Sequence, residues 1–459
     1  MIEQTRKALE EIEKQNKKYR HFCLVAKDYA LTRAKELDKE KQKGKLSGMF
    51  VSVKDAICVK GVESRAGSQI LSGYKPPFNA TVIENVLAEG AIIVGKTSQD
   101  EFGFGTFSTN VGNGFEVPKN PHDVERATGG SSGGCAGWTS LSSFPHVSIA
   151  ESTGGSIACP AGFCGVAGIT PTYGRVSRYG LMDYASSLDK IGAMGKTVRE
   201  AALLLEVIAG SDGKDATALL QPKENFSAFA GKSAKGMRIG VVKELMGSGI
   251  DSGVRKIVQQ SIDSLEKQGA KISEISLPLS AKYAIPAYYL IATAEASTNL
   301  AKYCGMRYGL EEKLEGNFDE YFSKVRSSAF GKEAKRRIML GTFARMSGYR
   351  DAYYLRALKV RTKIIQEFQQ QFKKVNVLAH PAMPFIAPKF KEIEKLSPLQ
   401  NYLSDVCLSP CNLGGFPHVS VNAGFSKGMP VGILFTSDHL QEGKAIQAAS
   451  AVEKVKECR

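Results

Sequence analysis

The sequence is poor in the residues that build metal sites and disulfide frameworks. Its 459 residues include one tryptophan and six histidines, and its nine cysteines form no C-x-x-C pair. These counts argue against a zinc site and against a set of disulfide bonds. No run approaches the roughly 18 apolar residues that a membrane-spanning helix needs, and residues 1–20 are charged rather than an apolar signal core. We therefore expect a soluble, cytoplasmic protein with no metal and no membrane contact.

Glycine and positive charge are present in excess. The 46 glycines make up about a tenth of the chain, against a usual ~7%, which is typical of a loop-rich enzyme. The formal net charge of +15 fits a nucleic-acid partner, an acidic protein partner, or lysines that only solvate exposed helix faces. Charge alone leaves these three interpretations open.

Helical and strand-like patterns alternate along the chain, which predicts an α/β protein. Helical patterns occupy residues 4–22, 30–41, 80–89, 197–210 and 253–269. Apolar runs typical of strands occupy residues 48–59, 91–94, 237–242, 270–277, 375–379, 419–421 and 431–435. A mainly helical excursion (about 285–374) interrupts the alternation, which then resumes. We therefore expect a single unit over residues 1–459, with an N-terminal helical segment of about 1–45.

Two short clusters of glycine and serine carry the clearest chemical signal. Residues 129–134 read Gly-Gly-Ser-Ser-Gly-Gly, and residues 153–156 read Thr-Gly-Gly-Ser. Glycine lets the backbone come close to a reacting group and presents N–H donors beside the serine hydroxyls. The clusters therefore predict a serine nucleophile next to an oxyanion-binding backbone.

Two familiar motifs overlap this part of the chain, and each lacks its usual setting. Residues 90–97 fit the phosphate-binding P-loop through Lys96, but a helical pattern precedes them and their variable positions form an apolar strand. We therefore expect Lys96 to be structural. Residues 130–134 fit the G-x-S-x-G nucleophile elbow around Ser132, but polar, turn-prone residues precede them instead of a strand. A histidine-dependent hydrolase with Ser132 as nucleophile is disfavoured.

A serine nucleophile needs a base, and Lys54 is the most unusual candidate. Alternation in its strand-like segment places Val51 and Val53 on one face and Ser52 and Lys54 on the other, which is otherwise uncharged. Burial of that face would favour the neutral amine, which can act as a general base. The alternative is an edge-strand lysine that points to water, and this segment alone does not exclude it.

Lys54 and the two clusters, in this order, resemble the amidase signature family. The resemblance continues through residues 160–165, 170–181 and 186–189 and covers nearly the whole chain. It implies the amidase signature fold, in which a central mixed β-sheet is covered by helices on both faces. It also implies a catalytic triad that contains no histidine.

The family pattern assigns a role to each residue of this Ser-Ser-Lys triad. Ser156 would be the acyl-forming nucleophile, Ser131 the bridging serine that follows a cis peptide bond, and Lys54 the terminal base. Ser131 would take the proton of Ser156 and pass its own to Lys54. The oxyanion hole would consist of the backbone N–H groups of Thr153, Gly154, Gly155 and Ser156.

Within the family the chain looks like the glutaminase component of a tRNA-dependent amidotransferase. That resemblance implies hydrolysis of glutamine to glutamate and ammonia, with Tyr288, Arg337 and Asp405 recognising glutamine. Arg337 suits the α-carboxylate and Asp405 the α-ammonium group. Two partners, subunits B and C, would complete a heterotrimer; the first would hold ATP and magnesium and use the ammonia, and the second would be small. This chain would need no cofactor of its own.

Several questions stay open at this point. The misacylated tRNA could be Glu-tRNA(Gln), Asp-tRNA(Asn) or both, and the sequence does not show whether this chain touches it. A free-standing amidase that hydrolyses a small amide with the same triad is the alternative function. A scaffold without activity is disfavoured because all three triad residues are present.

The sequence also departs from the usual family pattern. The interval between Ser131 and Ser156 is one residue longer than usual. We expect the extra residue within 138–148, as a bulge or an added helical position that keeps the two serines within hydrogen-bond reach. Further departures are Ser152 in place of an aspartate with Glu151 just before it, Ala158 in place of an arginine, and Ala56 in place of an asparagine.

Overall fold

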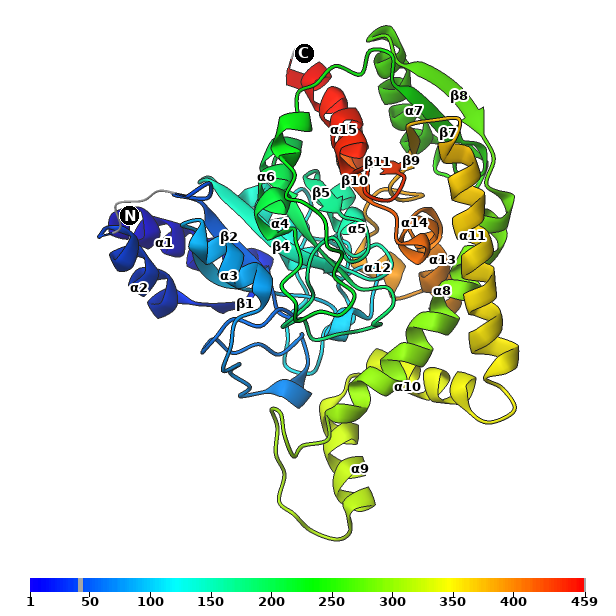
Figure 1. Ribbon diagram of the computed structural model, residues 1–459. Coiled ribbons are helices and arrows are strands. Elements are labelled where there is room, and N and C mark those ends of the chain that lie inside the picture. Colours follow the sequence, from blue (N-terminus) through cyan, green and yellow to red (C-terminus); the bar gives the residue numbers. More distant parts are fainter. Residues whose placement is uncertain (40–43, 458–459) are drawn as a thin grey trace.

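One mixed β-sheet runs through the protein (Figure 1). The computed structural model describes residues 1–39 and 44–457, with the backbone alone for 454–457. In this part of the chain the eleven strands are ordered β1-β3-β2-β4-β6-β5-β10-β11-β9-β7-β8. Their bounds are β1 Phe22–Val25, β2 Phe50–Lys54, β3 Ile92–Thr97, β4 His146–Ser152, β5 Ala167–Thr170, β6 Lys190–Gly195, β7 Arg238–Val242, β8 Lys271–Ile275, β9 Val377–Pro381, β10 His418–Ser426 and β11 Met429–Ser437.

The strand pairing brings the ends of β2 and β4 together. β2 pairs in parallel with both β3 and β4, and β7 pairs in parallel with β8 and β9. The strands between these groups pair antiparallel. Because parallel strands end at the same edge of a sheet, Lys54 at the end of β2 lies next to the last residues of β4. The predicted mixed α/β sheet is confirmed.

Helices cover both faces of the sheet. A Cβ atom added at Gly168 would come within 2.8 Å of Ala161 in α5 (Ala158–Cys164). One added at Gly195, on the opposite face, would come within 2.7 Å of Ala201 in α6 (Val198–Ile208). α4 (Gly133–Leu141) shares the face of α5, and α15 (Glu442–Glu457) lies beside α6 (Figure 1). The predicted two-sided covering is therefore confirmed.

The remaining helices lie at the two ends of the sheet and in an arm. α1 (Ile2–Tyr19) and α2 (Lys27–Leu37) pack at the β1 end. The helix expected over residues 30–41 thus ends earlier, and residues 40–41 lie outside the described residues. α3 (Thr81–Ala88) lies between β2 and β3 in the chain. The helices between β7 and β9 are α7 Ser252–Lys267, α8 Pro278–Asn299, α9 Phe318–Ala329, α10 Lys332–Arg345 and α11 Arg356–Phe372. Three short helices follow β9: α12 Phe390–Ile393, α13 Pro398–Leu403 and α14 Ser409–Gly414.

The α8–α11 segment extends away from the sheet and then returns to it (Figure 1). α8 packs against α10, α11 and α14. This arrangement carries residues of α8 and α10 back to the edge where β2 and β4 end. Among the described residues no helix is both long enough and apolar enough to cross a membrane.

Candidate active site

Lys54 lies deep in the protein with its amine against Ser131. Its side chain is 0% exposed, and Nζ lies 2.7 Å from Ser131 Oγ. The same nitrogen contacts Glu151 twice, at 2.8 Å from Oε2 and 3.1 Å from the carbonyl oxygen. Burial excludes the alternative of a lysine that points to water. The face that Lys54 shares with Ser52 carries no other charge, but Glu151 reaches Nζ from the end of the neighbouring strand β4.

Ser131 and Ser156 lie on adjacent segments of backbone. The Gly130–Ser131 peptide bond is cis, as the resemblance implied. The N–H of Ser132 donates to the carbonyl oxygen of Ser156 at 3.2 Å. No hydrogen bond joins the two hydroxyls of Ser131 and Ser156 in the described part of the chain. Catalytic hydrogen bonds often tighten only when substrate binds, so transfer between these serines stays a prediction.

The turn between β4 and α5 holds Ser156 and the glycines before it at a small cavity. Within residues 44–457 we find no acceptor for the backbone N–H groups of Gly154, Gly155 and Ser156. A Cβ atom at Gly154 would lie 2.4 Å from the ring of Tyr288, and Gly155 has φ of +151°. Only glycine fits such backbone, and its free N–H donors suit the predicted oxyanion hole.

The three residues predicted to recognise glutamine converge on this same cavity. Tyr288 comes from α8, Arg337 from α10 and Asp405 from a short helical turn after α13, and all three line the cavity with Ser156. A guanidinium group and a carboxylate therefore share one small space with the predicted nucleophile. Tyr289 lines the cavity as well.

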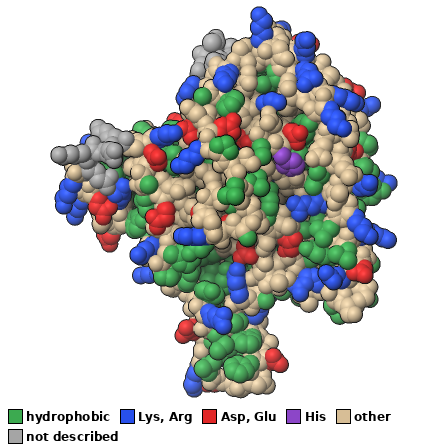
Figure 2. All heavy atoms as spheres, viewed as in Figure 1, with side chains coloured by type: hydrophobic (Ala, Val, Ile, Leu, Met, Phe, Trp, Pro, Cys, Tyr) green, Lys and Arg blue, Asp and Glu red, His purple; other side chains and the backbone are tan. Residues whose placement is uncertain are grey.

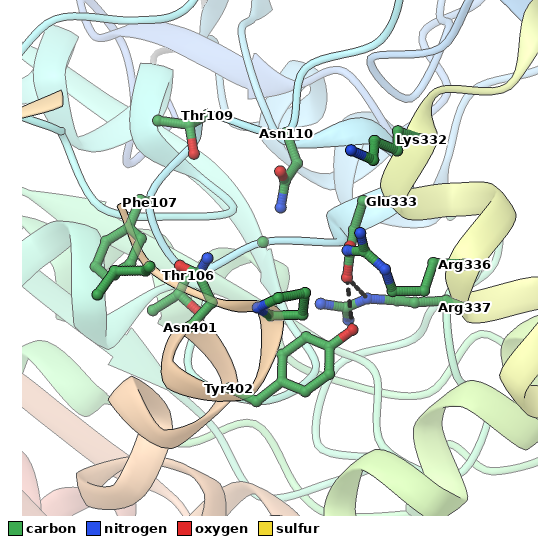
Figure 3. A pocket seen from close by; sticks show the side chains of 13 residues that line it. Thr106, Phe107, Thr109, Asn110, Lys332, Glu333, Arg336, Arg337, Asn401 and Tyr402 are labelled. Carbon is green, nitrogen blue, oxygen red and sulfur yellow. Dashed lines mark hydrogen bonds and ion pairs between the residues drawn. The ribbon is translucent and has the colours of Figure 1, made fainter. Parts of the chain in front are cut away.

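Arg337 is held in place before any ligand enters. Its Nε donates to Glu333 Oε1 at 2.9 Å, and one terminal nitrogen donates to the Tyr184 hydroxyl at 2.6 Å. The Tyr402 hydroxyl donates to the same Glu333 oxygen at 2.9 Å (Figure 3). Four rings lie 5.2–5.7 Å from the guanidinium carbon, those of Phe104, Tyr184, Tyr289 and Tyr402. Such a fixed, aromatic-lined guanidinium suits a ligand carboxylate.

Asp405 is held by two hydroxyl groups. Its Oδ1 accepts from Thr106 at 3.0 Å, and its Oδ2 accepts from Tyr289 at 2.6 Å. Burial raises the pKa of Asp405 to about 6, against the lowering effect of these two hydrogen bonds. Asp405 is therefore mostly ionised at neutral pH and can pair with a ligand cation.

A wider cavity of about 280 Å³ adjoins this site. Figure 3 shows its residues arriving from three elements: the loop with Thr106 and Asn110, helix α10 with Arg336, and α13 with Tyr402. Arg337 lines both the outer and the inner cavity. Gly105 is shared in the same way, so the two cavities lie side by side.

Comparison with known proteins decides the family. The Amidase family profile matches residues 3–446 of the chain. The chain belongs to the amidase family. It is 45% identical over 457 residues to the A subunit of glutamyl-tRNA(Gln) amidotransferase of Thermoanaerobacter pseudethanolicus, covering 99% of this chain and 92% of that one. It is 46% identical to the Koribacter versatilis protein of the same name, covering 96% and 92%.

A solved structure agrees with these sequence matches. The crystal structure of the A subunit of glutamyl-tRNA(Gln) amidotransferase from Thermotoga maritima superposes with a TM-score of 0.81 at 36% identity. The match covers 98% of this amidase and 90% of that chain. The peptide amidase of Stenotrophomonas maltophilia gives a TM-score of 0.80 at 25% identity, over 99% and 93%.

The key side chains of the two competing motifs, Lys96 and Ser132, lie outside the cavity of this amidase. Lys96 is buried in β3, where Nζ donates to the carbonyl oxygen of Ile57 and, at 2.9 Å, contacts Ser64 Oγ. The Ser132 hydroxyl donates to the Glu151 carbonyl oxygen at 3.0 Å and does not line the cavity. Both side chains therefore have structural partners. No cluster of three His, Cys, Asp or Glu side chains suitable for a metal occurs among the described residues.

The departures from the family pattern leave the catalytic turn in place. Strand β4 keeps a continuous register with both β2 and β6, so it contains no bulge. The extra residue therefore belongs to α4 or to the turn before β4. The hydroxyl of Ser152 contacts Asn412 Oδ1 at 3.3 Å rather than Lys54 or Ser131.

Proposed function

We propose that this amidase is the glutaminase subunit of a tRNA-dependent amidotransferase. The observation that carries the proposal is the placement of Arg337 and Asp405 in one cavity with Ser156. Glutamine has a carboxylate and an ammonium group at one end and a neutral amide at the other. If Arg337 and Asp405 bind the charged end, the amide is left for Ser156.

The reaction proposed follows from the positions of the three groups. Ser156 Oγ attacks the side-chain amide carbon while its proton moves to Ser131, whose own proton moves to Lys54. The N–H groups of residues 153–156 stabilise the developing oxyanion. The relay then runs in reverse: Ser131 gives one proton to the departing nitrogen, which leaves as ammonia, and takes back a proton from Lys54. Water then hydrolyses the glutamyl ester to glutamate.

The ammonia would be used elsewhere in a larger assembly. The curated relatives are named as the A subunit of glutamyl-tRNA(Gln) amidotransferase, a name that supports Glu-tRNA(Gln) as the substrate amidated in the complex. We assign ATP and magnesium to the B subunit, with the C subunit completing a heterotrimer. Because the proposed substrate is a tRNA, we expect the reaction in the cytoplasm.

An apolar surface near the cavity mouth supports a protein partner. On α10, Met339, Leu340 and Phe343 are 72%, 46% and 45% exposed. The rings of Tyr349 and Tyr353 lie 4.7 and 6.0 Å from that of Phe343 and extend this surface. Figure 2 shows hydrophobic side chains on the neighbouring arm at the bottom of the view, where Figure 1 labels α9. α10 also carries Arg336 of the outer cavity, so a B subunit that docks here would receive ammonia at the mouth of the site.

The test is a reconstitution of the purified chain with its two cognate partners. We expect glutamine hydrolysis that rises on addition of the B subunit, ATP and Glu-tRNA(Gln), and that Ser156→Ala abolishes. Fast turnover of simple amides by the isolated chain, with no response to the partners, would instead establish a free-standing amidase. Supplying Asp-tRNA(Asn) in place of Glu-tRNA(Gln) shows whether both are amidated.

A further inference from the structure

Two buried carboxyl groups stand in line behind Lys54, and the Ser-Ser-Lys relay uses neither. Glu151 Oε2 lies 2.8 Å from Lys54 Nζ. The Thr153 hydroxyl lies 2.8 Å from Glu151 Oε1 and 2.8 Å from Asp189 Oδ1. All four side chains are buried. A continuous hydrogen-bonded chain therefore runs from Asp189 through Thr153 and Glu151 to the terminal base.

The geometry identifies which carboxyl carries the proton. The single hydrogen of the Thr153 hydroxyl can be donated to one carboxyl only, so the other carboxyl must donate to it. Asp189 Oδ2 already accepts the N–H groups of Tyr184 and Ala185, at 2.8 and 2.9 Å, which leaves Oδ1 for a proton. Burial, together with the charge of Glu151, raises the pKa of Asp189 well above its ordinary value. Asp189 is therefore the protonated partner, and Glu151 is the charged one.

The charged groups around this chain support that assignment. Lys54 is the basic group in contact with Glu151. The charge of Asp183 raises the pKa of Asp189, and the charge of Arg178 lowers it. The charge of Lys54 also lowers the pKa of Asp100, but the carboxylate of Asp100 accepts hydrogen bonds from the backbone N–H groups of residues 108 and 110.

The contacts of Nζ define what Glu151 can do for the base. Two of them go to Glu151, through Oε2 and the carbonyl oxygen, and the third goes to Ser131 Oγ. A neutral amine that donates both hydrogens to Glu151 must direct its lone pair at Ser131. When the proton of Ser131 arrives, the carboxylate lies directly against the ammonium group that forms.

We infer that Glu151 is a positioning residue of the relay. Its charged carboxylate, fixed by Thr153 and protonated Asp189, aims Lys54 at Ser131 and stabilises the ammonium form of Lys54. The inference rests on the relay of the proposed function, but not on glutamine as the substrate.

The test compares wild type with Glu151→Gln, Glu151→Asp and Asp189→Asn in two assays over a range of pH. One assay measures the rate at which a fluorophosphonate labels Ser156, which reports on the relay whatever the amide substrate is. The other measures kcat/KM for glutamine in the reconstituted complex. Thermal melting of each variant checks that it is folded.

We expect Glu151→Gln to lower the plateau labelling rate at least about tenfold. It should also move the acid limb of the pH profile to lower pH by about one unit, because a negative charge beside Nζ is lost. Glu151→Asp keeps the charge but is one methylene shorter, so it should slow labelling and leave the acid limb in place. Asp189→Asn should move the acid limb much less than Glu151→Gln does, because its amide can still donate to Thr153 and accept the two N–H groups.

Two results would overturn the inference: an unmoved acid limb in folded Glu151→Gln, or a shift in Asp189→Asn as large as in Glu151→Gln. A structural role alone would lower the rate without moving the limb. If Ser156 of wild type is labelled but glutamine is not hydrolysed, the proposed function fails and the labelling series still tests Glu151.

Discussion

Replacing Asp405 with asparagine should separate glutamine binding from stability. The carboxylate accepts from Thr106 and Tyr289. In the asparagine variant one of these hydroxyls can turn to accept from the amide nitrogen, while the other still donates to the amide oxygen. Asparagine has almost the same shape, so the cavity should keep its form. What it loses is the negative charge opposite the proposed position of the glutamine ammonium group.

The expected loss in binding is large. Removing one partner of a buried, hydrogen-bonded charge pair costs about 2–5 kcal/mol. This free energy corresponds to a rise of about 30-fold to a few thousand-fold in KM for glutamine. Because the ammonium group does not react, we expect kcat to change much less than KM. Below pH 6, where Asp405 of wild type takes up a proton, KM of wild type should rise as well.

The effect on stability has the opposite sign. Burial raises the pKa of Asp405 from 3.8 to about 6 in the folded protein, a displacement worth about 3 kcal/mol. The protonated form of Asp405 stabilises the fold fully at pH values below 3.8, its pKa in the unfolded chain, and this stabilisation is lost as pH rises through about 6. Asparagine carries no charge at any of these pH values, so the variant does not lose stability as pH rises through 6. Asp405→Asn should therefore be at least as stable as wild type at pH 8.

The assay is steady-state glutaminase kinetics of the reconstituted complex, with chemical unfolding of both proteins at pH 4 and pH 8. The reasoning is refuted if KM is unchanged in a folded Asp405→Asn variant. It is also refuted if that variant unfolds more easily at pH 8, because Asp405 would then have a structural role. Thr106→Val serves as a control that removes one hydroxyl and keeps the charge.

Three further outcomes follow from the geometry. Ser131→Ala should lower glutaminase activity by at least about a thousandfold. Ser132→Ala loses one hydrogen bond to a carbonyl oxygen, so it should cost about 1 kcal/mol of stability and keep most activity. Equal losses of activity in the two variants would contradict the assignment of the relay. Phe343→Asp should weaken association with the B subunit at least about tenfold in a titration, while Leu220→Asp, at a position 89% exposed, should not. Burial raises the pKa of Glu101 to about 7, so the free energy of unfolding should fall as pH rises through 7. Glu101→Gln should remove this dependence, and a variant with the same pH dependence as wild type would exclude Glu101 as its cause.

Local sequence patterns predicted the elements of the fold well. The apolar runs at 237–242 and 270–277 became β7 and β8, and Thr197 caps α6 through a capping box with Glu200. Each of these signals lies within a few neighbouring residues. The run at 48–59 yielded a shorter strand, because the chain turns after Lys54, where the N–H of Ile57 bonds to its carbonyl oxygen.

The surroundings of the site were predicted less completely, because distant segments supply them. Alternation predicted that Lys54 shares a strand face with Ser52, but it left the burial of that face open, and no local pattern indicates that Glu151 would meet Lys54. Likewise, Glu333 lies four positions before Arg337 on an ordinary charged helix, and only the fold brings Tyr402 to it. Tyr289 was missed beside Tyr288, since nothing in a pair of adjacent tyrosines shows that one of them bonds to Asp405.

The measurement that tests the central claim most directly is the detection of a glutamyl ester on Ser156. The complex would be mixed with glutamine, quenched in acid within the first turnover, digested and examined by mass spectrometry. The account predicts a glutamyl group on the peptide that contains Ser156, absent from Ser156→Ala and strongly reduced in Lys54→Ala. A glutamyl group on Ser132, or glutamine hydrolysis that persists in Ser156→Ala, would contradict it.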